Sequence, residues 1–153
     1  MIMAGYTGQY DCKIDAKGRL KLPAGLLRQL SENQSGKFVV NKGLDNNLDL
    51  YTEEEWDKIT SKMGNLTRLN SKYRKFLRAF YKHAVPVESD SSNRILIHKK
   101  LSDLIQLESE AVIMCYGSTI EIWSKDIYEA ENEEIENFSE MADDIFNDLN
   151  IDL

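Results

Sequence analysis

Residues 15–30 read DAKGRLKLPAGLLRQL, and residues 90–105 read DSSNRILIHKKLSDLI. The two stretches align without a gap, and the acid, the arginine and the apolar residues fall at the same positions in both. The matched pairs are Asp15 with Asp90, Arg19 with Arg94, Leu20 with Ile95, Leu22 with Ile97, Leu26 with Leu101 and Leu30 with Ile105. This self-similarity indicates that the 153-residue chain contains two copies of one small unit.

A second pair of strands follows each copy of the repeat. Residues 37–52, KFVVNKGLDNNLDLYT, correspond to residues 110–124, EAVIMCYGSTIEIWS, and each has apolar residues on both sides of a turn that contains Gly or Asn. Each unit is therefore predicted to run strand, turn, strand, short helix, strand, turn, strand, and then a longer helix. Thr52 and Ser124 stand where the longer helices begin, in the position of helix caps. We expect four segments: a first module at 1–51, linking helices at 52–84, a second module at 85–124 and an acidic helical tail at 125–153.

The repeat opens on a tight turn in both copies. Gly18 supplies a backbone position that accepts a positive φ, and Asn93, at the same place in the second copy, is the next most tolerant residue type. Asp15 and Asp90 stand where a carboxylate accepts backbone N–H groups or pairs with the nearby arginine. All four residues are therefore predicted to stabilise the turns.

The two arginines admit two interpretations. Arg19 and Arg94 either brace their own turns by pairing with the aspartates, or they point outward to a ligand. Their presence at matching positions in both copies, with Lys13, Lys17 and Lys21 beside the first turn, favours contact with DNA phosphates and base edges. We therefore predict that double-stranded DNA is a partner.

The charge distribution is compatible with DNA binding despite a net charge of −7. Eleven acidic residues and no lysine or arginine lie between Asp126 and the end of the chain, so residues 1–125 hold fifteen acidic residues against all nineteen basic ones, a balance of +4. The main body is therefore mildly basic, and the acidity is concentrated in the tail.

Membrane insertion, secretion and metal binding are not indicated. No stretch reaches the roughly 20 apolar residues of a membrane-spanning helix, and MIMAGYTGQY lacks a basic segment followed by an apolar one. Cys12 and Cys115 stand apart without metal-ligand spacing, and we expect both to be small apolar residues of strands. We expect a cytoplasmic, nucleoid-associated protein without a metal or another cofactor.

The segment between the modules is predicted to form two helices, broken near Gly64 and Asn65. Its apolar residues recur every three or four positions, which indicates a core or a subunit interface: Leu66, Leu69, Tyr73, Phe76, Leu77 and Phe80. A second face carries only bases, and it is either solvated or a further phosphate-binding or partner surface: Arg68, Lys72, Arg74, Lys75, Arg78 and Lys82. The acidic tail keeps periodic apolar residues, so we expect an amphipathic helix that docks on a neighbour, with this basic helix as a candidate site.

The duplicated motif resembles that of the MraZ family, whose members carry two AbrB-like half-modules, each marked by an Asp-x-x-x-Arg turn. The first copy of the family motif reads DxKGR, an apolar residue and then LP, which DAKGRLKLP matches. GQYDCKI, at 8–14, is similar to the entry into the family's first strand, and RILI and IEIW are similar to its strands in the second half. The resemblance spans residues 5 to about 128. It departs from the family at Asn93, where glycine is common, and at His98, where proline is common.

The resemblance implies an α+β fold in which the halves form swapped-hairpin β-barrel modules about a pseudo-two-fold axis, with amphipathic helices after each half. It also implies that several chains assemble into a ring and bind tandem repeats in the promoter of the division and cell-wall gene cluster. Carried over to this sequence, the DNA-contacting residues are Lys17, Arg19 and Arg94.

Two other classes of function are weaker fits. A ring-forming scaffold or protein-interaction module without DNA binding could use the same duplicated fold. Catalysis is not indicated, because His83 and His98 lack a neighbouring nucleophile motif or a paired base. We therefore expect neither an enzyme nor a small-molecule substrate.

Overall fold

The computed structural model describes residues 5–30 and 34–151. Residues 1–4 and 31–33 of the expected first module, and residues 152–153 of the acidic tail, lie outside these ranges. The first half contains β1 (Tyr6–Lys13), β2 (Arg19–Lys21), α1 (Ala24–Leu27), β3 (Lys37–Lys42) and β4 (Leu48–Thr52), followed by α2 (Glu53–Met63) and α3 (Ser71–Tyr81). The second contains β5 (Val85–Glu88), β6 (Arg94–Leu96), α4 (Lys99–Leu104), β7 (Glu110–Gly117) and β8 (Thr119–Ser124), followed by α5 (Lys125–Glu131) and α6 (Phe138–Leu149). The predicted order of elements is confirmed in both halves.

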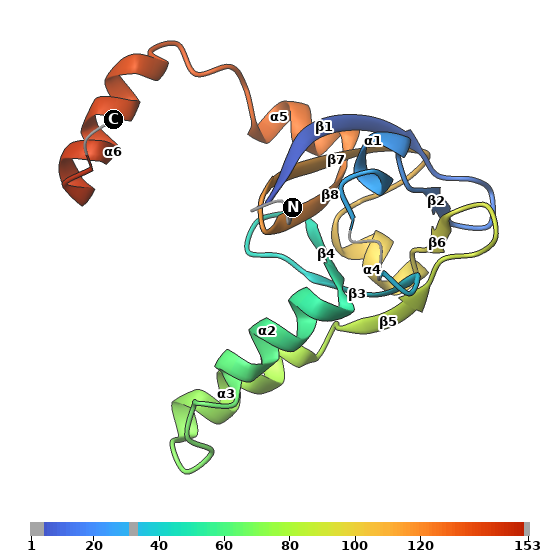
Figure 1. Cartoon of the computed structure of the whole chain (residues 1–153), viewed down its shortest axis with the longest axis horizontal. Coiled ribbons are helices and arrows are strands. Elements are labelled where there is room, and N and C mark those ends of the chain that lie inside the picture. The colour runs from blue at the N-terminus through green and yellow to red at the C-terminus, as the bar shows by residue number, and fades with distance from the viewer. Residues whose placement is uncertain (1–4, 31–33, 152–153) are drawn as a thin grey trace.

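The two halves exchange strands. The six-stranded sheet has the order β1-β7-β8-β4-β3-β5, and all its pairs are antiparallel. The first strand of the first half therefore pairs with the second half's hairpin, and the first strand of the second half pairs with the first half's hairpin (Figure 1). Neither half completes its sheet alone. The sheet ends at β1 and β5, so a closed barrel is not confirmed.

A smaller sheet of β2 and β6 is the centre of the pseudo-symmetry. Its register pairs Arg19 with Leu96, Leu20 with Ile95, and Lys21 with Arg94. Leu20 and Ile95 are equivalent in the repeat, and they lie opposite each other with no exposed surface. A two-fold axis through this pair relates the other two pairs of the sheet to each other.

The apolar positions of the repeat form the core. Seven of them are 2% exposed or less: Leu20, Leu22, Leu26, Ile95, Ile97, Leu101 and Ile105. Val40, Leu48, Ile113 and Ile122 of the large sheet pack in the same cluster. Cys12 and Cys115 lie in β1 and β7, as predicted for small apolar residues of strands. Burial of these aliphatic side chains is the main source of stability.

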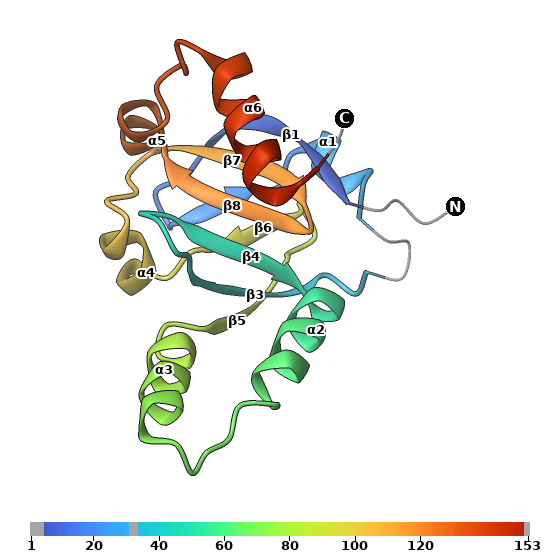
Figure 2. The same cartoon turned by 90° about the vertical axis from the view of Figure 1, so that its left-hand side faces the viewer.

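The linking helices and the last helix extend from this body (Figures 1 and 2). The predicted break is confirmed, because α2 ends at Met63 and Gly64 follows as its C-cap. The indole of Trp56 stacks on Phe80 with 5.7 Å between ring centroids, and the buried Asn41 Nδ2 donates a 2.8 Å hydrogen bond to the carbonyl oxygen of Phe80. No side chain of α3 is buried, so its apolar face does not belong to the chain's own core. None of the helices within residues 5–30 and 34–151 has the length and hydropathy needed to cross a membrane.

Candidate nucleic-acid interface

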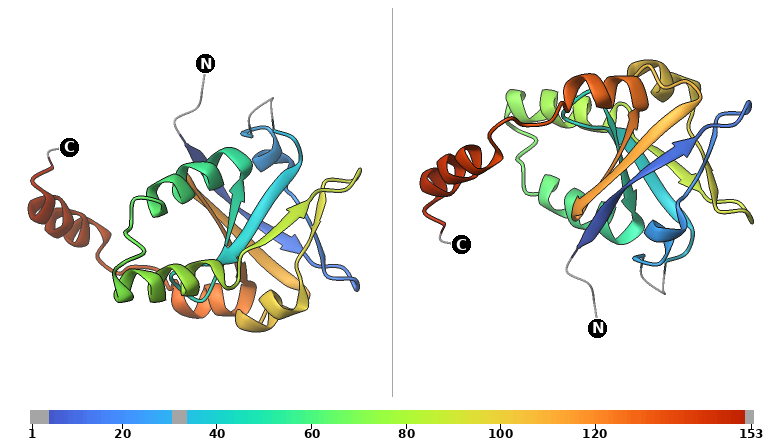
Figure 3. Two further views of the ribbon diagram at one scale, coloured as in Figure 1. Left: turned by 90° about the horizontal axis from the view of Figure 1, so that it is seen from below. Right: turned by 90° about the horizontal axis from the view of Figure 1, so that it is seen from above.

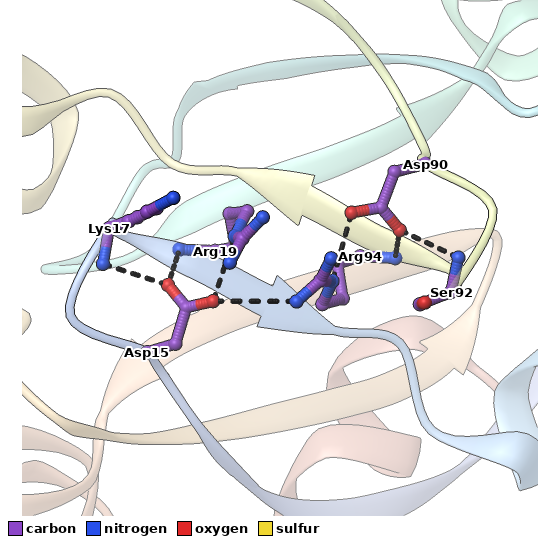
Figure 4. Close-up of polar contacts among 6 residues, drawn as sticks. All are labelled: Asp15, Lys17, Arg19, Asp90, Ser92 and Arg94. Atoms are coloured by element: carbon purple, nitrogen blue, oxygen red, sulfur yellow. Dashed lines mark hydrogen bonds and ion pairs between the residues drawn. The ribbon is translucent and has the colours of Figure 1, made fainter.

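The first turn is organised around the carboxylate of Asp15 (Figure 4). Its Oδ1 accepts 2.9 Å hydrogen bonds from the backbone N–H groups of Lys17 and Arg19, and its Oδ2 accepts a 2.8 Å bond from Arg19 Nε. Gly18, at φ 83°, provides the left-handed backbone position that closes the turn. The predicted role of Asp15 as a backbone acceptor and as a partner of Arg19 matches this geometry.

The second turn repeats the first atom for atom. Asp90 Oδ1 accepts hydrogen bonds from the N–H groups of Ser92 at 2.8 Å and Arg94 at 3.0 Å, and its Oδ2 accepts a 2.9 Å bond from Arg94 Nε. Asn93 adopts φ 59°, so it replaces glycine in the left-handed region without changing the turn. This departure from the family motif therefore leaves the turn's architecture intact.

Backbone hydrogen bonds join the two turns. The N–H of Ile97 donates to the carbonyl oxygen of Gly18, and the N–H of Leu22 donates to that of Asn93, both at 2.9 Å. These symmetric bonds flank the β2–β6 pair and hold both bends at one end of the molecule (Figure 3). The repeat predicted two equivalent turns, and the structure places them side by side.

One contact across the turns could not be inferred from the spacing of the motif. Arg94 Nη1 lies 3.8 Å from Asp15 Oδ2, the same oxygen that binds Arg19 Nε. Asp15 thus faces the guanidinium groups of both turns. The only sequence signal for this contact is the repeat itself, which does not reveal that the two turns meet.

The arginines brace their turns and still remain accessible. The side chains of Arg19 and Arg94 are 31% and 32% exposed, and Lys17 and Lys21 are exposed beside them. Each aspartate binds its own arginine through Nε. Among the described residues, the terminal nitrogens of Arg19 make no hydrogen bond within the protein, and those of Arg94 face only Asp15. The bracing interpretation and the outward-pointing interpretation are therefore compatible.

The hydrogen-bond donors around each aspartate keep it ionised. The backbone N–H of Arg19 is the largest cause that lowers the pKa of Asp15 below its ordinary value, and the N–H of Arg94 has the same effect on Asp90. The surface formed by Asp15, Lys17, Arg19, Lys21, Asp90 and Arg94 has four bases against two acids. It is a cationic ribbon whose arginine planes are held in fixed orientations.

Comparison with known proteins agrees with the duplicated motif. The family described as "MraZ protein, putative antitoxin-like" matches the chain twice, over residues 6–79 and 80–148. The chain belongs to the MraZ family. A "Transcriptional regulator MraZ" of Christiangramia forsetii is 35% identical over 152 residues, which cover 98% of both chains. The protein of the same name in Thermoanaerobacter sp. is 39% identical over 94% of this chain and 98% of its own length. The one in Cytophaga hutchinsonii is also 39% identical, over 83% of this chain and 84% of its own length. The two MraZ matches meet at residues 79 and 80, near the end of α3.

Proposed function

We propose that this protein is a transcriptional regulator that binds double-stranded DNA through its two Asp-x-x-x-Arg turns. Relatives that span nearly all of the chain bear the name of a transcriptional regulator. The observation that carries the proposal is the pair of bonded turns, with Arg19 and Arg94 held by their aspartates and still about one-third exposed.

The geometry suits recognition in the major groove. A two-stranded ribbon fits this groove, and arginine binds the O6 and N7 acceptors of guanine through paired N–H groups. In each turn the aspartate holds Nε, which leaves both terminal nitrogens of Arg19, and the Nη2 of Arg94, for base edges or phosphates. Lys17, at the tip of the first turn, binds a phosphate and sets the register of the ribbon.

Several copies act together on DNA. A single chain offers one small ribbon, and joining chains into a ring raises the effective concentration of each ribbon next to the others. Such an assembly selects tandem repeats, here in the promoter of the division and cell-wall gene cluster. In this proposal the protein acts in the cytoplasm, on the nucleoid, and does not catalyse a reaction. Its two halves form AbrB-like swapped-hairpin modules.

A ring-forming scaffold without DNA binding is the second candidate. One observation favours it: α3 and α6 carry opposite charges, and each leaves large apolar side chains exposed among the residues that the structure describes. In this case the exposed arginines only brace the turns, and the helices carry the function.

Binding of labelled duplexes separates the two functions. Fluorescence anisotropy with the promoter repeats of the chain's own operon, compared with a scrambled duplex of the same length, is measured at 50 and 200 mM salt. A regulator binds the repeats more tightly at both concentrations, and its affinity falls as salt rises because counterions are released from the phosphates. Equal, weak binding to both duplexes supports the scaffold.

A further inference from the structure

The last helix leaves its apolar face uncovered. Phe138, Met141, Ile145 and Leu149 of α6 recur every three or four residues, and they are 71%, 48%, 44% and 62% exposed. Four large apolar side chains on one helical stripe form a surface that soluble proteins normally cover. Figure 1 shows α6 set off from the body of the molecule after the segment that follows α5.

Helix α3 has an uncovered apolar face of its own. Phe76 is 47% exposed, and Leu69, just before the helix, is 93% exposed. Trp56 of α2 stacks on Phe80 and meets Tyr81 edge to face, so one end of this face is partly covered and the other is open. The open part lies on a helix anchored to the sheet through Asn41, which gives a partner a rigid platform.

The two helices have opposite charges of equal number. Within Ser71–Tyr81, α3 carries four bases and no acid: Lys72, Arg74, Lys75 and Arg78. Within Phe138–Leu149, α6 carries four acids and no base: Glu140, Asp143, Asp144 and Asp148. The stretches are 11 and 12 residues long, which at about 1.5 Å per residue gives two cylinders of nearly the same length. An apolar stripe bordered by one sign of charge on each helix therefore fits its counterpart on the other.

Figure 2 shows the sheet between α6 at the top and α3 at the bottom, and in Figure 1 α6 lies at the upper left with α3 well below it. We propose that α6 of one protomer docks on α3 of a neighbouring protomer, with the two apolar stripes in contact and the acidic residues of α6 beside the basic residues of α3. This interface rests on the self-assembly proposed above and names the surfaces that produce it.

Charge reversal and exchange test this interface in the full-length chain. One variant carries Lys72→Glu with Lys75→Glu on α3, and the other carries Asp144→Lys with Asp148→Lys on α6, all at exposed positions. Each variant alone places two like charges against the facing helix and leaves the changed helix with two bases and two acids, so it should weaken association about tenfold or more in sedimentation velocity. In a 1:1 mixture, contacts between unlike variants join either two unchanged helices or two helices whose reversed positions are again opposite in charge. Alternating assemblies should therefore recover the wild-type mass. Lys99→Glu with Lys100→Glu on α4 is the matched control, and it should leave the mass unchanged.

The outcomes separate this interface from assembly through a different surface and from a role of α3 in DNA binding. Both variants assembling like the wild type, or a mixture that fails to recover assembly, would overturn the interface while leaving self-assembly in place. A variant at Lys72 and Lys75 that assembles normally but loses DNA affinity would overturn it and assign α3 to phosphate binding. A wild-type chain that is monomeric at tens of micromolar would overturn both the interface and the proposed assembly. DNA binding by the turns is measured separately, on variants at Arg19 and Arg94.

Discussion

Arg94 Nη1 lies 3.8 Å from Asp15 Oδ2, an atom that already accepts a 2.8 Å hydrogen bond from Arg19 Nε. The equivalent contact, between Arg19 and Asp90, is absent from the ion pairs of the described residues. The pseudo-symmetry of the two turns is therefore broken at one point. Asp15 orients both guanidinium groups, whereas Asp90 orients only its own.

Removing the charge of Asp15 should affect recognition more than removing that of Asp90. Asp15→Asn weakens the hold on Arg19 and Arg94 together, whereas Asp90→Asn affects Arg94 alone. The measured quantity is the ratio of affinities for promoter repeats and a scrambled duplex, because losing an acid near DNA also strengthens non-specific binding. We expect the ratio to fall further for Asp15→Asn, and a fall that is equal or larger for Asp90→Asn would contradict the shared role.

The left-handed positions of the turns should differ in their tolerance to substitution. Gly18→Ala places a Cβ at φ 83° and 3.3 Å from the carbonyl oxygen of Ile97, and it should lower the free energy of unfolding by about 1–2 kcal/mol. Asn93→Gly keeps a residue that accepts φ 59°, so its effect should stay within about 0.5 kcal/mol. Urea titration measures both, and equal losses would argue against a strained bend.

The N-caps of α2 and α5 form a matched pair. Thr52 Oγ1 accepts a 3.1 Å hydrogen bond from the N–H of Glu55, whereas Ser124 occupies the same place without a side-chain cap bond. Thr52→Ala should therefore destabilise the protein by about 1 kcal/mol in chemical denaturation, and Ser124→Ala by clearly less. Equal costs for the two substitutions would show that the cap bond contributes little.

Asp49 should make stability depend on pH. Burial is the main cause that raises its pKa to about 6, and nearby Glu121 adds to the effect. The folded state therefore binds this proton more tightly than the unfolded state, whose pKa is near 3.8, so the free energy of unfolding falls as pH rises from about 4 to about 6.

The Asp49→Asn variant has no carboxyl group to ionise, so it avoids this fall in the free energy of unfolding. It should be more stable than the wild type by about 1 kcal/mol at pH 7.5, since solvent screens the partly buried group, and should lose this advantage below pH 4. Thermal unfolding across this pH range makes the comparison. A variant that is less stable than the wild type at pH 7.5 would contradict the assignment.

The sequence predicted the local structure of this protein better than its long-range contacts. Duplicated spacing located both turns, and the apolar positions of the repeat proved to be the core, because burial follows from side-chain periodicity. Periodicity does not determine which strands pair, so the repeat itself did not predict the exchange of β1 and β5. The family resemblance implied swapped hairpins, and the structure shows which strands pair. The Asp15–Arg94 contact depends on that exchange, and it could not be predicted for the same reason.

The helices show a second limit of sequence reasoning. The apolar stripe of α3 fitted a core or a subunit interface equally well, because both require the same spacing. Exposure of Phe76 in the folded chain decides against the core. Likewise, Ser124 was correctly placed at a helix start, but whether its hydroxyl forms the cap bond depends on a rotamer that the sequence does not specify.

The most direct test of the central claim is the affinity of an Arg19→Ala/Arg94→Ala double variant for promoter repeats at 100 mM salt. Lys58→Ala/Lys62→Ala, which removes the same charge from α2, is the control, and circular dichroism confirms that both variants are folded. We predict that the double arginine variant loses its preference for the repeats over scrambled DNA while the control retains it. A folded arginine variant that binds the repeats as tightly and as selectively as the wild type would contradict the claim.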